Sequence, residues 1–104
     1  MRYFTDIRGR VIGLTDERRD HLETGHPEMR GQMDRIGEVL QAPERIVLSR
    51  SDPTVELYYK LYEQTPVTKK FLCVVVKSPD AAGFIVTAYY TDTVKKGTTL
   101  WPTK

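Results

Sequence analysis

The chain has 104 residues, which suits one folded domain and is too short for two domains with separate cores. Hydrophobic residues make up 39% and charged residues 29%, so the composition excludes a disordered chain. The formal net charge of +2 is too small to indicate nucleic-acid binding by itself. We therefore expect a single domain over residues 1–104, in which any anion-binding role depends on a local cluster of charge.

The single cysteine and the N-terminus both bear on where the protein works. Cys73 lies in the apolar run from Phe71 to Val76, so a buried thiol and a reducing compartment are expected. The N-terminus lacks the basic patch and apolar stretch of a signal peptide, and no run approaches the ~18 apolar residues of a membrane span. These features predict a cytoplasmic protein with no membrane contact.

Two short strands and two helices are predicted before residue 42. A turn former at residues 6–9 predicts a short N-terminal hairpin within residues 2–13. Thr15, followed by two acidic residues, is a typical helix cap and predicts a helix over 15–24, which Gly25 ends. Pro27 begins a second helix over 27–41, because proline is tolerated at the first helical position.

After Pro43 the hydrophobic period changes from helical to alternating, and four strands are predicted at 45–50, 55–62, 70–77 and 84–91. Helices followed by strands favour an α+β fold, with both helices on one face of a four- to five-stranded antiparallel sheet. The other sheet face is expected to be open, and Trp101 to close the edge of the core. The predicted core comprises Met33, Ile36, Leu40, Val74, Val76, Val86 and Ala88.

Several kinds of site are excluded by the absence of their motifs from the sequence. There is no GxxxxGK[ST] phosphate loop, no GxGxxG dinucleotide loop, no HExxH, and a single cysteine cannot build a CxxC knuckle. His21 and His26 are five positions apart, which places them on different faces of a helix. We therefore expect neither a metal site nor a cofactor.

The histidines are better candidates for acid/base chemistry, because imidazole titrates near neutrality. His26 lies just before Pro27, at the N-terminal end of the second helix, where the helix dipole disfavours imidazolium and suits a general base. A hydrogen-bonded helix cap is an equally good interpretation of that position. His21 shares a helical face with Leu14 and Arg18, which favours a half-buried residue that orients its neighbours.

The strands supply polar candidates on the predicted open face. Alternation places Thr87, Tyr89 and Thr91 together, and Tyr58, Lys60 and Tyr62 can share that face in their own strand. Aromatic and basic residues interleaved on a sheet can stack bases and neutralise phosphates, although a solvated polar face is the more ordinary interpretation. Lys95 and Lys96, just before Gly97, form either an anion contact or a solvated charge pair.

The order and spacing of several short motifs resemble a known family. They are the segments 14–18 with His21, 25–29, 42–46, 49–55 with Tyr58 and Tyr59, 73–77, 85–89 and 91–97 with Trp101. Together they resemble the phage and bacterial branch of the superfamily of barnase, EndoU, colicin ribonucleases and RelE. The resemblance covers nearly the whole chain, from about Leu14 to Trp101.

The resemblance implies a metal-independent ribonuclease fold whose exposed sheet face holds RNA, and superfamily members are often toxins with tRNA or mRNA substrates. It implies functional positions at His21, His26 and the segment Thr87 to Tyr89. The chain departs from the family at Gly25, where members often carry a basic residue before the histidine. That departure removes one potential phosphate ligand.

The leading hypothesis is an endoribonuclease that activates the ribose 2′-hydroxyl for attack on the adjacent phosphate. Its expected groups are His26 as base, His21 or Tyr89 as acid, and phosphate contacts from Arg45, Lys60 and Thr87, all converging on one concave site. The competing hypothesis is a nucleic-acid- or protein-binding module without turnover. A toxin held by a small antitoxin protein is a third reading, which adds a partner without changing the chemistry.

Overall fold

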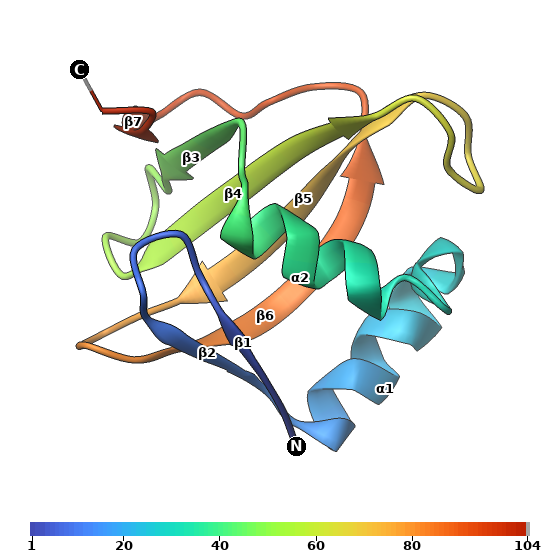
Figure 1. The fold of residues 1–104 in the computed structure, drawn as a ribbon, viewed down its shortest axis with the longest axis horizontal. Coiled ribbons are helices and arrows are strands. Elements are labelled where there is room, and N and C mark those ends of the chain that lie inside the picture. Colours follow the sequence, from blue (N-terminus) through green and yellow to red (C-terminus); the bar gives the residue numbers. More distant parts are fainter. Residues whose placement is uncertain (104) are drawn as a thin grey trace.

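The computed structural model describes residues 1–103, in which a mixed sheet carries helices on one face (Figure 1). The elements in chain order are β1 (Arg2–Thr5), β2 (Val11–Leu14), α1 (Asp16–Gly25), η1 (Pro27–Met29, a 3₁₀ turn), α2 (Met33–Gln41), β3 (Arg45–Leu48), β4 (Val55–Tyr62), β5 (Lys70–Lys77), β6 (Gly83–Thr91) and β7 (Thr98–Trp101). No helix in this described part of the chain is long and apolar enough to cross a bilayer. The α+β class agrees with the expectation from sequence.

The sheet is larger than expected, with seven strands in the order β1-β2-β6-β5-β4-β3-β7. Its centre is the predicted antiparallel meander of β3, β4, β5 and β6. The N-terminal hairpin joins this meander through a parallel pairing of Ile12 with Gly83 and of Gly13 with Phe84. At the other edge, β7 pairs with β3. The sheet is therefore mixed, because β2 runs parallel to β6 while the other neighbouring strands pair antiparallel.

The first helix forms as its cap predicts. The Thr15 hydroxyl accepts a hydrogen bond from the Arg18 amide at 3.1 Å, and Asp16 and Glu17 occupy the first turn. An oxygen at this position satisfies an amide that has no partner within the helix, and acidic side chains oppose the positive end of the dipole. Leu22 is the buried residue that anchors α1 to the rest of the molecule.

The prediction of one continuous helix over 27–41 is wrong for its first turns. Only Pro27–Met29 is helical there, as η1, and α2 begins at Met33. Gly31 has φ +76°, a left-handed conformation that glycine adopts readily and that a continuous α-helix cannot include. The chain therefore turns between η1 and α2, and η1 packs against α1 and β6 rather than extending α2.

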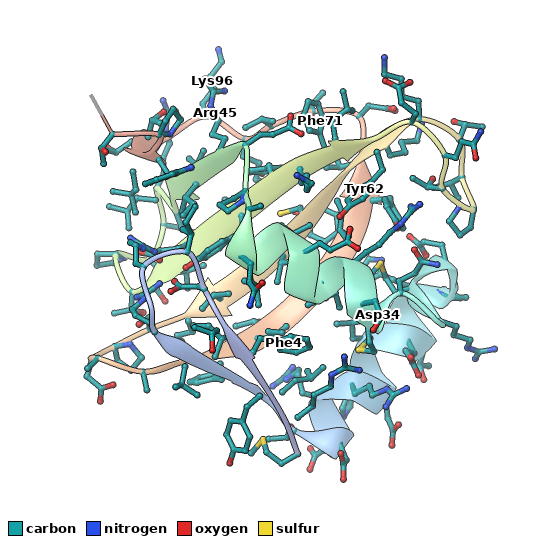
Figure 2. The ribbon with its side chains drawn as sticks, in the orientation of Figure 1. Phe4, Asp34, Arg45, Tyr62, Phe71 and Lys96 are labelled. Carbon is teal, nitrogen blue, oxygen red and sulfur yellow. The ribbon has the colours of Figure 1, made fainter. Side chains whose placement is uncertain are left out.

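The main core lies between the helices and the sheet. It contains every predicted core residue except Val86, which is only half-buried. The pairing of β5 with β6 shifts register between Val75 and Val76, so Val86 falls at a bulge and leaves the alternation that sequence assumes. Phe4 lies between the β1–β2 hairpin and α2, as Figure 2 shows, and Trp101 packs at the edge of this core.

The opposite sheet face is only partly open. It carries a second, smaller core of Val47, Leu57, Tyr59 and Cys73. The connection from β6 to β7 crosses this face: Val94 packs on the second core, and the Lys95 amide donates to the Tyr59 hydroxyl at 3.1 Å. A Cβ at Gly97 would overlap the Leu48 carbonyl and lie 2.8 Å from Val47 Cγ1, so only glycine allows this close crossing.

Candidate nucleic-acid cleavage site

A cleft of about 430 Å³ opens on the sheet face opposite α2. Its floor is the row Leu57, Val75 and Thr87, which lie side by side on β4, β5 and β6. One wall is the β3–β4 loop and the other is the connection from β6 to β7. The lining residues are Ser49, Arg50, Ser51, Val55, Leu57, Val75, Thr87, Tyr89, Lys95 and Lys96. The volume lies within the range of small-molecule sites and is large enough for one nucleotide.

Tyr89 stands at one end of this floor, in the next row of the sheet. It is paired with Cys73 on β5, which is in turn paired with Tyr59 on β4. Partial burial, together with the neighbouring Cys73, raises the pKa of the Tyr89 phenol. Its hydroxyl therefore carries its proton at neutral pH and can donate it to an anion in the cleft.

His26 is held at the junction of α1 and η1 by both of its backbone groups. Its amide donates to the Leu22 carbonyl at 2.8 Å and its carbonyl accepts from the Met29 amide at 2.9 Å. Leu22 and Met29 are themselves buried in the main core. The local sequence thus anchors the chain on either side of His26 and fixes where its side chain emerges.

The His26 imidazole emerges against Tyr89, with ring centroids 5.5 Å apart and planes inclined at 30°. Its side chain is 39% exposed, so the ring contacts the protein and also meets solvent. The Glu28 carboxylate lies on the Nδ1 side, 3.9 Å away. A partly exposed imidazole beside a protonated phenol is an arrangement that can remove one proton and supply another.

The cleft walls are positively charged. Arg50 extends from the β3–β4 loop, Lys95 and Lys96 come from the connection between β6 and β7, and all three are exposed. Among the described residues that line the cleft, none carries a carboxylate. These cations therefore face an anionic ligand without a competing acid in the lining, which is the electrostatic requirement for binding phosphate.

Sequence reasoning missed three polar members of the lining, Ser49, Arg50 and Ser51. The available signal is the segment 49–55, which contributes to the family resemblance but is interpreted structurally as the end of the strand 45–50 and a turn before Val55. Across residues 1–103, no three His, Cys, Asp or Glu side chains gather into a set that could hold a metal ion.

The predicted binding roles of Tyr58 and Lys60 are wrong, because both residues lie on the helix-covered face of β4. Tyr58 is fully buried, and its hydroxyl donates to Asp6 Oδ2 at 2.6 Å. Burial, together with Asp6, raises the pKa of Tyr58 to about 12. The Lys60 ammonium donates a hydrogen bond to the Ala42 carbonyl at 3.1 Å, near the end of α2. It is Leu57 and Tyr59 that face the other side of the sheet.

His21 and Arg45 are not brought to the cleft. The His21 side chain is 69% exposed on α1 and lines a separate shallow hollow with Glu17, Asp20 and Thr24. Its described ionic contact is with Glu17, at 3.9 Å. Arg45 begins β3 and is exposed, outside the cleft lining (Figure 2). The predicted constellation is thus reduced to His26, Thr87, Tyr89, Lys95 and Lys96.

Comparison with known proteins agrees with the chemistry of this cleft. No curated protein and no solved structure was found to match the chain. A family model described as phage-Barnase-EndoU-ColicinE5/D-RelE like nuclease2 matches residues 1–102, nearly the whole chain. The superfamily expected from the sequence motifs is confirmed. The chain belongs to this family, and it is a nuclease of the barnase, EndoU, colicin and RelE type.

Proposed function

We propose that the protein is a metal-independent endoribonuclease that cleaves RNA by attack of a ribose 2′-hydroxyl on the adjacent phosphate. The observation that carries the proposal is the packing of the His26 ring on the Tyr89 ring, with centroids 5.5 Å apart. The pair lies beside a cleft lined by Arg50, Lys95 and Lys96. An imidazole, a phenol and three cationic side chains can supply a base, a proton donor and charge compensation without any Lewis acid.

In this reaction His26 removes the proton from the 2′-hydroxyl, and the 2′-oxygen forms a bond to phosphorus. The bond from phosphorus to the 5′-oxygen breaks, and that oxygen takes the proton of the Tyr89 hydroxyl. The products are a 2′,3′-cyclic phosphate and a free 5′-hydroxyl. The imidazolium then returns its proton to the phenolate through solvent, so the enzyme ends in its starting state.

The cations and Thr87 act on the phosphate. Negative charge accumulates on the non-bridging oxygens as the phosphorane forms, and Lys95, Lys96 and Arg50 compensate it. The Thr87 hydroxyl lies on the cleft floor, where it can donate a hydrogen bond to a phosphate oxygen. His21, exposed on α1, has no role in this scheme.

The proposal is tested by incubating the purified protein with end-labelled RNA and with DNA of the same sequence, each in excess EDTA. We expect cleavage of the RNA alone, with a 2′,3′-cyclic phosphate on the upstream product. Cleavage that requires a divalent cation, or equal cleavage of the DNA, would contradict it. Binding of RNA without cleavage in any buffer would favour the competing module without turnover.

A toxin role belongs to the same proposal, because a ribonuclease that nothing restrains can cleave the messages of the cell that makes it. We expect induced expression to arrest growth and the His26→Ala variant to be tolerated at the same protein level. Growth arrest by both proteins would separate toxicity from cleavage. A co-expressed small protein that restores growth and co-purifies with the nuclease would be the expected antitoxin.

A further inference from the structure

Most of the exposed large hydrophobic side chains in residues 1–103 gather on one part of the sheet. Tyr3 is 66% exposed and Phe84 is 44% exposed. Met1, just before β1, and Val11, on β2, are exposed as well. A contiguous patch of exposed apolar side chains is typical of a surface that binds a ligand or another macromolecule. The question is which ligand their chemistry and position fit.

Cross-strand pairing connects this surface to the cleft. Tyr3 is paired with Gly13, Gly13 with Phe84, Phe84 with Lys77, and Lys77 with Val55. Directly paired residues share a face of the sheet, so this row runs across five strands on the face that holds the cleft. Val55, at its far end, lines the cleft itself. The aromatic surface and the cleft are therefore parts of one continuous face.

The Tyr3 ring lies over Gly13, because its Cε1 is 3.7 Å from the position that a Gly13 Cβ would take. Phe84 is the next residue along the row. Adjacent strands lie about 4.8 Å apart, so the four steps from Tyr3 to Val55 span about 19 Å. A dinucleotide held in the cleft does not reach Tyr3, whereas an oligonucleotide of about eight residues does.

The row has little free charge between its ends. The Lys77 ammonium is 3.5 Å from the Asp52 carboxylate, and this ion pair is partly exposed. A ligand that bound here through its phosphates would gain little. A ligand that presents flat apolar faces would gain much more, because the bases of a single strand stack on exposed aromatic side chains.

We propose that Tyr3 and Phe84 form a stacking platform for unpaired bases of the same RNA strand whose scissile phosphate lies in the cleft. This inference rests on the proposed ribonuclease function and adds to it a second binding site, remote from the reacting atoms. It makes the substrate a single-stranded RNA segment several nucleotides long. The platform contributes affinity through stacking, whereas the cleft contributes it through charge.

The test uses RNA in which every 2′-hydroxyl is methylated, so that it binds and cannot be cleaved by the proposed reaction. Affinities of an oligonucleotide of about eight residues and of a dinucleotide are measured for the wild type, Tyr3→Ala and Phe84→Ala. We expect each substitution to weaken the longer ligand roughly 5- to 100-fold, and Tyr3→Ala to leave the dinucleotide unchanged because the dinucleotide does not reach Tyr3. The salt dependence of binding should keep its slope in both variants, because no phosphate contact is lost.

Matched substitutions identify stacking as the cause. Tyr3→Phe keeps an aromatic ring and should bind like the wild type, whereas Phe84→Leu keeps an apolar side chain without the flat ring and should bind like Phe84→Ala. Val67→Ala removes an exposed apolar side chain from the β4–β5 loop, outside the row, and should change nothing. Unaltered affinity of Tyr3→Ala and Phe84→Ala for the longer RNA would overturn the platform.

Two further outcomes would also overturn it. If Tyr3→Ala weakened the dinucleotide as much as the longer RNA, the loss would come from the cleft and not from the platform. A wild-type dimer in sedimentation velocity that becomes monomeric in both Tyr3→Ala and Phe84→Ala would assign the surface to a second copy of the chain. Cleavage of unmodified RNA in EDTA is measured separately, so its absence refutes the proposed reaction without deciding the platform.

Discussion

The imidazole of His26 lies against the phenol ring of Tyr89, although one residue follows α1 and the other lies near the end of β6, more than sixty positions later in the chain. The contact arises because η1 packs on β6 and carries His26 to the border of the sheet face that holds the cleft. A group that can accept a proton and a group that keeps its proton at neutral pH are thereby held together. The first prediction separates the ring of Tyr89 from its hydroxyl.

Tyr89→Phe keeps the ring that supports His26 and removes the proton donor. We expect the rate constant of cleavage to fall roughly 10²-fold, with little change in affinity for RNA, because donation to the leaving oxygen acts only in the transition state. Tyr89→Ala also removes the support of His26 and should be slower still. Single-turnover kinetics on labelled RNA measure both variants, and an unimpaired Tyr89→Phe would exclude the phenol as acid.

Lys96 and Lys60 lie on opposite faces of the sheet, so we expect different effects on RNA binding when each is removed. Lys96→Ala should weaken RNA binding and lower the slope of log affinity against log salt by about one unit, because one phosphate contact and its released counterion are lost. Lys60→Ala removes the same charge from the helix-covered face, where the ammonium contacts the Ala42 carbonyl. It should leave the salt slope unchanged. If both substitutions lowered the salt slope equally, RNA binding would depend on the total charge of the protein and not on the sheet face that holds the cleft.

Gly97 controls how closely the connection from β6 to β7 crosses the sheet. Gly97→Ala should destabilise the protein by about 1–3 kcal/mol, because the new methyl group overlaps the Leu48 carbonyl and the connection must move outwards. Gly25→Ala is the matched control, since a Cβ there meets no atom within 4 Å. Chemical denaturation measures both variants. A loss below about 0.5 kcal/mol in Gly97→Ala would mean that the crossing is loose.

Stability should depend on pH through Asp6, whose side chain is buried. Burial alone would raise the pKa of this carboxyl, but hydrogen bonds from Tyr58 and from Arg10 outweigh burial and hold its pKa below 3.8. A lowered pKa in the folded state adds stability above the unfolded pKa of about 3.9. That stability is lost as the pH falls through the lower, folded value.

Asp6→Asn should therefore cost roughly 2–4 kcal/mol at pH 7, because it removes the buried carboxylate that accepts from the Tyr58 hydroxyl and from Arg10, and leaves Glu56 to pair with the guanidinium groups. The difference from the wild type should shrink below about pH 4. Asp34→Asn, whose carboxylate is almost fully exposed, should cost much less at every pH. Urea denaturation from pH 3 to 7 measures the three proteins, and a cost for Asp6→Asn that is independent of pH would contradict the assigned role.

Sequence reasoning placed the helix start at Thr15 and the four central strands, because caps and alternation are local signals. It failed at β4, where both faces of the strand are buried. Leu57 and Leu61 alternate with Tyr58 and Lys60, and the alternation predicts that Tyr58 and Lys60 lie on the open face. Asp6, brought from the β1–β2 turn, instead gives the buried Tyr58 hydroxyl its partner. A contact between such distant segments has no signature in the alternation of either.

The site was predicted in part for the same reason. His26 was recognisable from its position before Pro27, and Thr87 and Tyr89 from alternation in one strand. Arg50 was missed because its place in the wall depends on how the β3–β4 loop faces the crossing segment. The choice between His21 and Tyr89 as acid also required the fold, since α1 turns His21 away from the cleft.

The most direct test of the account compares His26→Ala with His21→Ala in the cleavage of labelled RNA in excess EDTA. Each substitution removes one imidazole from the same short segment, but only His26 contacts Tyr89 beside the cleft. The account predicts that His26→Ala is roughly 10²–10⁴-fold slower with its circular dichroism unchanged, and that His21→Ala cleaves at the wild-type rate. A fully active His26→Ala, or an equal loss in His21→Ala, would contradict it.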